Sequence, residues 1–173
     1  EWVVAVAGKD VQPNEAFSEL MNGQAGKSLE VLVNSRPNRE GARTVKITPM
    51  SRGAFTAQLY EHTVQRTRQR VEQLSEGRFA YLHIRAMDQP SLQRFERELI
   101  TEAYDKEGLV LDVRWNGGGR IHDELFAILA RKVHAFETPR DALKMTQPFG
   151  AFTRPMILLC NQSSFSDAEI FTN

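Results

Sequence analysis

The chain has 173 residues, which is enough for one domain or for two small ones with a buried core. Apolar residues make up 41% of the sequence and charged residues 25%, a composition typical of globular proteins. The 22 basic and 22 acidic residues cancel, so net charge gives no reason to expect binding to nucleic acid or to an anionic membrane surface. No apolar stretch approaches the roughly 20 residues of a membrane span.

The first fifty residues predict a small α+β or barrel-like module. An apolar run at residues 2–7 and a Gly-Lys-Asp turn at residues 8–10 indicate a strand and a tight turn. Pro-Asn-Glu at residues 13–15 then predicts the start of a short helix. Residues 29–33 and 44–48 alternate apolar and polar side chains, as strands do. Nothing in this module resembles a catalytic site.

Residues 51–76 change in character and predict a helical linker. The helix is expected at residues 57–74, where apolar positions are few and the surface should be largely solvated. Arg66, Arg68 and Arg70 raise the alternative of a patch for an anionic partner. Because no aromatic residues lie between these arginines, a solvated helical face is the favoured interpretation.

From Gly77 the pattern alternates between strands and helices. The strands are expected at residues 79–84, 109–113 and 157–160 and the helices at residues 91–104 and 123–132, with Ser91 as the first helix cap. A long connection at residues 135–153, with room for short strands, precedes the last strand. This order predicts a mainly parallel α/β sheet with its functional site outside the carboxyl ends of the strands.

One serine stands at such a strand end. The apolar run at residues 157–160, which contains the single cysteine Cys160, predicts a strand buried on both faces. The turn at residues 161–165 leads to Ser166, and Glu169 completes the S-x-x-E spacing of a capping box. A serine between strand and helix is also displayed as nucleophiles are, beside free backbone N–H groups. The spacing alone favours the helix cap, since capping boxes are common.

Three glycines follow the preceding strand at the same predicted edge. Residues 116–119 (NGGG) form either a flexible turn or a backbone that approaches a ligand closely. A phosphate loop is disfavoured because neither nucleotide-binding glycine motif is present. Acyl transfer needs a nucleophile and two donors to the oxyanion. Ser166, the N–H of Asp167 and an N–H from Gly117 or Gly118 would meet that need.

These two segments carry a family resemblance. Residues 108–119 (GLVLDVRWNGGG) and 161–171 (NQSSFSDAEIF) resemble the tail-specific, C-terminal processing serine peptidases, and most of all their tricorn branch. Residues 81–84 (YLHI) and 136–140 (FETPR) are also similar to that branch. The resemblance implies that Ser166 is the nucleophile, that the oxyanion hole is formed by the N–H groups of Asp167 and of Gly118 or Gly117, and that no metal or other cofactor is used.

The resemblance also implies a domain organisation. Residues 1–50 are similar to the later part of a PDZ domain, residues 51–76 would be the helical linker, and residues 77–173 would begin a crotonase-like peptidase core. The family's general base is a histidine before the PDZ domain, assisted by a glutamate after the nucleophile, or a lysine after it. Since none of the four histidines matches that base, we expect a fragment truncated at both ends and inactive alone. His122, three residues past the glycines, is the only one near the predicted site.

The resulting hypothesis is a serine endopeptidase that acts on peptides or unfolded proteins. For the full-length protein, the hypothesis includes assembly into a homo-oligomer as one alternative. A non-catalytic peptide-binding module is the alternative, and a nucleotide-binding α/β domain is a third class. The compartment stays open: the tricorn branch implies cytoplasm, a periplasmic location is the alternative, and a single cysteine does not decide.

Overall fold

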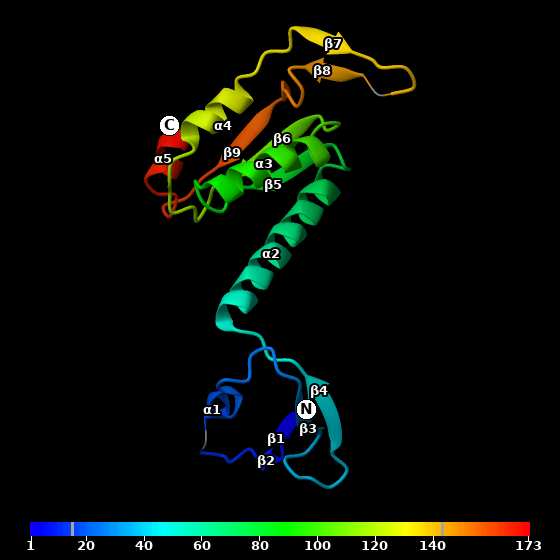
Figure 1. Cartoon of the computed structure of the whole chain (residues 1–173), viewed down its shortest axis with the longest axis vertical. Helices are drawn as coiled ribbons and strands as arrows, with labels where there is room; N and C mark the ends of the chain where they lie inside the picture. The colour runs from blue at the N-terminus through cyan, green and yellow to red at the C-terminus, as the bar shows by residue number, and fades with distance from the viewer. Residues whose placement is uncertain (15, 143) are drawn as a thin grey trace. The chain divides into compact units, whose positions relative to one another are not determined.

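The computed structural model describes residues 1–14, 16–142 and 144–173, so the part of the predicted helix start that falls on Glu15 lies outside the described residues. The chain divides into two compact units, Glu1–Glu61 and His62–Asn173, which are coloured from blue to cyan and from cyan to red in Figure 1. In the described residues, no helix has the length and apolar character that crossing a membrane requires.

The first unit is built on an antiparallel sheet of order β2-β1-β3-β4. Its strands are β1 (Trp2–Val6), β2 (Lys9–Asp10), β3 (Leu29–Asn34) and β4 (Arg43–Ile47), so the strands predicted from residues 2–7, 29–33 and 44–48 are confirmed. Helix α1 (Phe17–Met21) has only five residues and no side-chain cap. Val6, Leu29 and Val31 form the buried core of this unit.

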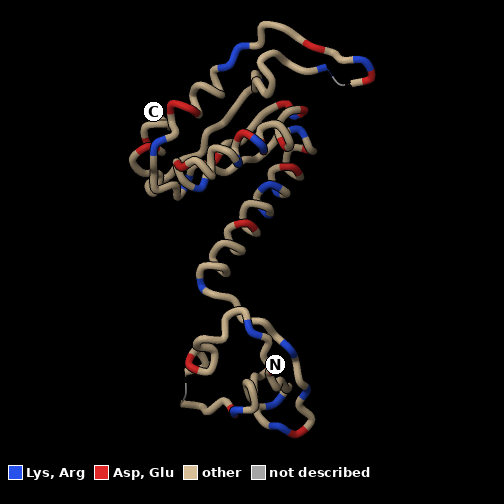
Figure 2. The backbone as a smooth tube through the Cα atoms, in the orientation of Figure 1, with Lys and Arg blue, Asp and Glu red and all other residues tan. Residues whose placement is uncertain are grey.

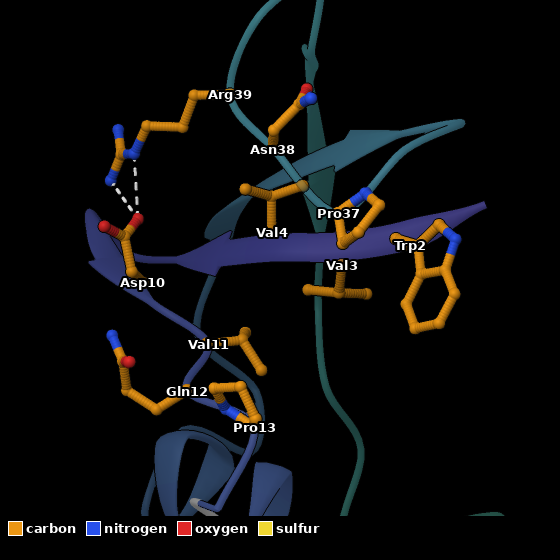
Figure 3. Close-up of a pocket in the computed structure, with 10 residues that line it drawn as sticks. All are labelled: Trp2, Val3, Val4, Asp10, Val11, Gln12, Pro13, Pro37, Asn38 and Arg39. Atoms are coloured by element: carbon orange, nitrogen blue, oxygen red, sulfur yellow. Dashed lines mark hydrogen bonds and ion pairs between the residues drawn. The ribbon is translucent and has the colours of Figure 1, made fainter.

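A cavity of about 390 Å³ lies beside β1 (Figure 3). Trp2 and Val4 of β1 line it together with Pro13, while Asp10 and Arg39 form an ion pair at one end. Arg39 donates from Nε and Nη2 to the same oxygen of Asp10, at 2.8 and 2.5 Å. Both side chains are about half exposed, so this pair contributes little stability and mainly tethers the loop before β4.

Helix α2 (Arg52–Leu74) begins five residues before its predicted start. Both basic and acidic residues lie along it (Figure 2), and in this fully described helix Val64 alone is buried. The prediction of a solvated face holds for Arg66 and Arg70, which are exposed. It is wrong for Arg68, whose guanidinium lies 2.9 Å from Glu98 and donates to the carbonyl of Tyr81, because the last turns of α2 pack against the second unit's own elements.

The second unit is built on a parallel sheet, as predicted, and its strands follow the order β5-β6-β9. Figure 1 shows the three strands β5 (Phe79–His83), β6 (Gly108–Asp112) and β9 (Met156–Leu159) side by side, and α3 (Gln89–Thr101) packs against β5. Helices α4 (His122–Leu129) and α5 (Asp167–Thr172) contact each other. The long connection carries the short hairpin β7 (Ala135–Glu137) and β8 (Met145–Gln147).

Two local predictions in this unit are wrong. Asp88, not Ser91, caps α3: its carboxylate accepts the N–H of Ser91 at 2.9 Å, and Pro90 fits the first turn because proline has no N–H to satisfy. Strand β9 is not buried on both faces, since Ile157 is 59% exposed and Cys160 follows the strand as an exposed residue. An apolar run indicates a strand but does not reveal which of its faces other elements cover.

The core of the second unit joins β5 and β6 to α3, α4 and α5. Leu82, Leu111, Phe95, Leu125 and Phe171 are representative members, each at most 4% exposed. This packing fixes the carboxyl ends of β6 and β9 and the starts of α4 and α5 relative to one another. The loops that connect β6 to α4 and β9 to α5 are therefore held at both ends by packed elements.

Candidate active site

The loops that follow β6 and β9 are bonded to each other at the carboxyl edge of the sheet. The N–H of Phe165 donates to the carbonyl of Asn116 at 3.0 Å, and the hydroxyl of Ser164 donates to the carbonyl of Val113 at 2.9 Å. The N–H of Trp115 donates to the Oδ1 of Asn161 at 3.1 Å. The two segments predicted to share this edge therefore meet there.

The glycine turn touches the serine turn at Gly118. A methyl group added at Gly118 would lie 2.8 Å from the Cβ of Ser166 and 3.1 Å from the backbone nitrogen of Asp167. Its φ of +94° is also a conformation that side chains disfavour. Only glycine fits this contact, which places the backbone of Gly118 directly against Ser166. Gly117, by contrast, is exposed and has no atom within 4 Å of the corresponding position.

Ser166 stands in a strained backbone conformation, with φ 55° and ψ −120°. The predicted capping box is wrong, because the side chain of Ser166 makes no capping hydrogen bond to α5. A cap needs an extended backbone that points the hydroxyl back at the helix, and a positive φ turns it away. Such a conformation costs about 1–3 kcal/mol and is concentrated at functional sites. Ser166 is exposed, as the serine of a strained strand-to-helix turn is when it acts as a nucleophile.

The backbone donors around Ser166 are not equivalent. The N–H of Gly118 donates to the Oδ1 of Asn116 at 2.9 Å. Asn116 is fully buried, and its amide also donates to the carbonyl of Ile84, so this side chain ties the glycine turn to the end of β5. The N–H of Gly118 therefore already has an acceptor in this structure.

The side chain of Asp167 holds the start of α4. It is 4% exposed, and its Oδ2 accepts the N–H groups of Ile121 and His122 at 2.8 and 3.2 Å. Its Oδ1 lies 2.5 Å from the Nδ1 of His122, which must donate because a carboxylate only accepts. His122 thus contacts the residue next to Ser166.

Sequence reasoning missed this contact, although a signal for it existed. Helix α4 starts at His122 after Ile121, which has no side chain able to cap it. Free N–H groups at a buried helix start need an acceptor, so one had to come from elsewhere in the chain.

A buried polar network supports the other end of the glycine loop. Asp112, at the end of β6, is 1% exposed and accepts from the hydroxyl of Tyr81 at 2.8 Å and from Arg114 at 2.6 Å. Burial pushes the pKa of Asp112 upward, but the hydrogen bonds from Arg114 and Tyr81 outweigh burial and leave that pKa lowered. Burial, followed by the bond to Asp112, raises the pKa of Tyr81.

His83 lies beside this network. Its Nε2 is 3.2 Å from the carbonyl of Arg114, and burial lowers its pKa. His62 and His134 are exposed. The residues that the structure describes contain no cluster of three or more His, Cys, Asp or Glu side chains able to hold a metal ion.

The sequence of the second unit matches a known family. Residues 78–173, more than half of the chain, match the profile of Peptidase family S41. The chain belongs to this family.

Curated relatives of this S41 chain bear the name tricorn protease. Tricorn protease homolog 1 of Streptomyces coelicolor is 34% identical over 169 residues, which cover 97% of this chain and 15% of the relative. Tricorn protease of Thermoplasma volcanium is 27% identical over 98% of this chain and 16% of its own length. The crystal structure of the tricorn protease matches with a TM-score of 0.78 and 25% identity, over 98% of this chain and 16% of that chain. The chain therefore spans about one sixth of the length of these relatives.

Proposed function

We propose that this chain carries the nucleophile of a tricorn-like serine peptidase, which hydrolyses peptide bonds through an acyl-enzyme on Ser166. The observation that carries the proposal is the left-handed, exposed Ser166 beside Gly118 and the N–H of Asp167 in a member of family S41. The names of the relatives support a protease.

The proposed chemistry follows from this geometry. The hydroxyl of Ser166 attacks the peptide carbonyl as a base removes its proton, and the tetrahedral oxyanion accepts hydrogen bonds from backbone N–H groups. The N–H of Asp167 is one donor. Because the N–H of Gly118 already donates to Asn116, Gly117 is the better second donor unless Asn116 releases Gly118 on substrate binding. The protonated base then gives its proton to the leaving amine as the C–N bond breaks, and water, deprotonated by the same base, attacks the acyl-enzyme and releases Ser166 with its proton restored.

The base is proposed to come from a part of the protein outside this chain. A base must reach the hydroxyl of Ser166. The resemblance implies either a histidine before the PDZ domain or a lysine after the nucleophile, and both positions would lie outside residues 1–173. His122 contacts Asp167, the residue next to Ser166, and its Nδ1 is engaged by that contact. On this view the 173-residue chain alone does not hydrolyse peptides.

The rest of the organisation is proposed from the same resemblance. Residues 1–50 would be part of a PDZ-like domain, residues 51–76 a linker, and residues 77–173 the start of a crotonase-like core. Peptides or unfolded proteins would be the substrates, and the full-length protein would assemble as a homo-oligomer.

The test is labelling of the full-length gene product with a fluorophosphonate probe, which reacts with activated serines. We expect labelling and peptide hydrolysis that are both lost in Ser166→Ala. Ser163→Ala, which changes a serine of the same turn, should retain them. Labelling that survives in Ser166→Ala would contradict the proposal. A wild-type protein that never labels but binds peptides would favour the alternative, a non-catalytic peptide-binding module.

A further inference from the structure

Two aromatic side chains are exposed next to Ser166. Trp115 is 70% exposed and Phe165 is 67% exposed, and these are the most exposed aromatic residues in the described part of the second unit. An aromatic side chain carries 150–250 Å² of largely apolar surface, so it is normally buried in a core or in an interface. Two of them on loops that are bonded to each other point to a binding surface.

The backbone places the two residues on neighbouring loops. Phe165 directly precedes Ser166, and its N–H donates to the carbonyl of Asn116, the residue after Trp115. The two side chains therefore belong to adjacent points on the two bonded loops, which also carry the contact between Gly118 and Ser166.

Trp115 is held in this position at a cost to the fold. Its φ is +66°, a left-handed conformation that glycine or asparagine adopts far more readily than a bulky residue. Its N–H is fixed by the bond to Asn161, which also accepts the N–H of Ser163 in the serine loop. The turn thus presents an indole to solvent from a rigid and strained backbone, and the packing of β6 does not require that indole, since Leu111 and Val113 are the buried side chains there. Strain of this kind, maintained by surrounding contacts, points to function.

We propose that Trp115 and Phe165 form an aromatic clamp that binds a large apolar or aromatic side chain of the peptide substrate next to the scissile bond. This inference rests on the proposed function, because it assumes that the carbonyl under attack lies at Ser166. A flat apolar side chain inserted between or against the two rings would cover their exposed surface and set the position of the substrate backbone. Peptides with glycine at that position would gain nothing from the clamp.

The experiment uses the full-length protein and two sets of fluorogenic peptides, which carry either phenylalanine or glycine at the positions flanking the scissile bond. Trp115→Ala and Phe165→Ala should each lower kcat/KM for the phenylalanine peptides by about tenfold or more, the size expected for removing apolar contacts from a specificity pocket. The loss for the glycine peptides should be much smaller. Trp2→Ala, a tryptophan of the first unit that is 59% exposed, is the matched control and should change neither set.

The outcomes separate the clamp from the proposed function. Trp115→Phe and Phe165→Leu keep apolar side chains and should retain most of the preference for phenylalanine, even if an alanine variant folds poorly. Equal losses of kcat/KM on both peptide sets, or no loss on either, overturn the clamp. If Ser166 is still labelled by the fluorophosphonate probe in that case, the proposed peptidase function stands. Failure of Ser166 to label in the wild-type protein overturns both.

Discussion

The buried carboxylate of Asp167 accepts hydrogen bonds from three donors, so its removal should destabilise the fold. Replacing Asp167 by alanine leaves the N–H groups of Ile121 and His122 and the imidazole of His122 without their acceptor. Unsatisfied buried donors cost about 1–3 kcal/mol each when they cannot reach water, so we expect Asp167→Ala to lose about 2–4 kcal/mol of stability. Urea unfolding of the chain, followed by circular dichroism, measures this loss.

Asp123→Ala is the matched control for that measurement. Asp123 lies in the first turn of the same helix, but its side chain is 89% exposed. Its favourable interaction with the helix dipole is worth about 0.3–1 kcal/mol. Equal losses in the two variants would mean that Asp167 does not anchor α4.

Short sequence motifs identified which residues lie at this site, but not the backbone conformation that they adopt there. The motifs around Gly118 and Ser166 predicted that the two turns meet, because parallel strands end at one edge. The S-x-x-E spacing also predicted a cap at Ser166, and that prediction failed. Capping propensity is local, whereas the φ of Ser166 occurs within a turn bonded to Asn116 and packed against Gly118, about fifty residues earlier in the chain.

At the scale of elements, the ends of β5 and β6 predict a pH dependence of stability. Burial lowers the pKa of His83 below its ordinary value of 6.5 in the folded chain. The unfolded chain therefore binds the proton more readily, and the contribution of His83 is fully present above about pH 6.5 and declines as the pH falls toward the folded pKa. The lowered pKa of Asp112 acts in another window, since its contribution is present above about pH 3.8 and is lost as the pH falls below that value.

His83→Gln tests this dependence, because glutamine keeps a donor for the carbonyl of Arg114 but does not titrate. The urea midpoint of the wild-type chain should fall between pH 7.5 and 5, and it should fall less in the variant. Any change of the urea midpoint with pH that remains in the variant comes from other titratable groups. An identical slope in both chains would show that burial of His83 does not influence its protonation.

Hydrophobic patterns predicted the strands and helices well, because the spacing of apolar residues follows the repeat of the local backbone conformation. The alternation of strands and helices after Gly77 predicted the parallel sheet that β5, β6 and β9 form. The burial of β9 was not predictable in the same way. An apolar run such as residues 156–159 predicts a strand, whereas the exposure of its side chains depends on which faces of the sheet are covered by elements distant in the sequence.

At the scale of the whole chain, the two units have cores of very different size. The first unit, of about sixty residues, buries Val6, Leu29 and Val31, whereas the second buries side chains from two strands and three helices. Domains of about sixty residues are marginally stable, since they bury a smaller share of their surface. We therefore expect the first unit to unfold at a lower urea concentration than the second.

Hydrogen exchange measured by mass spectrometry at rising urea concentrations resolves the two units. Peptides that contain β3 report the first unit, and peptides that contain β6 report the second, because both strands are paired on two sides in their sheets. Amides of β3 should lose protection first, while those of β6 stay protected until the major transition. Loss of protection in both strands at one urea concentration would mean that the chain unfolds as a single cooperative unit, and that the small core of the first unit is stabilised by something other than its own buried side chains.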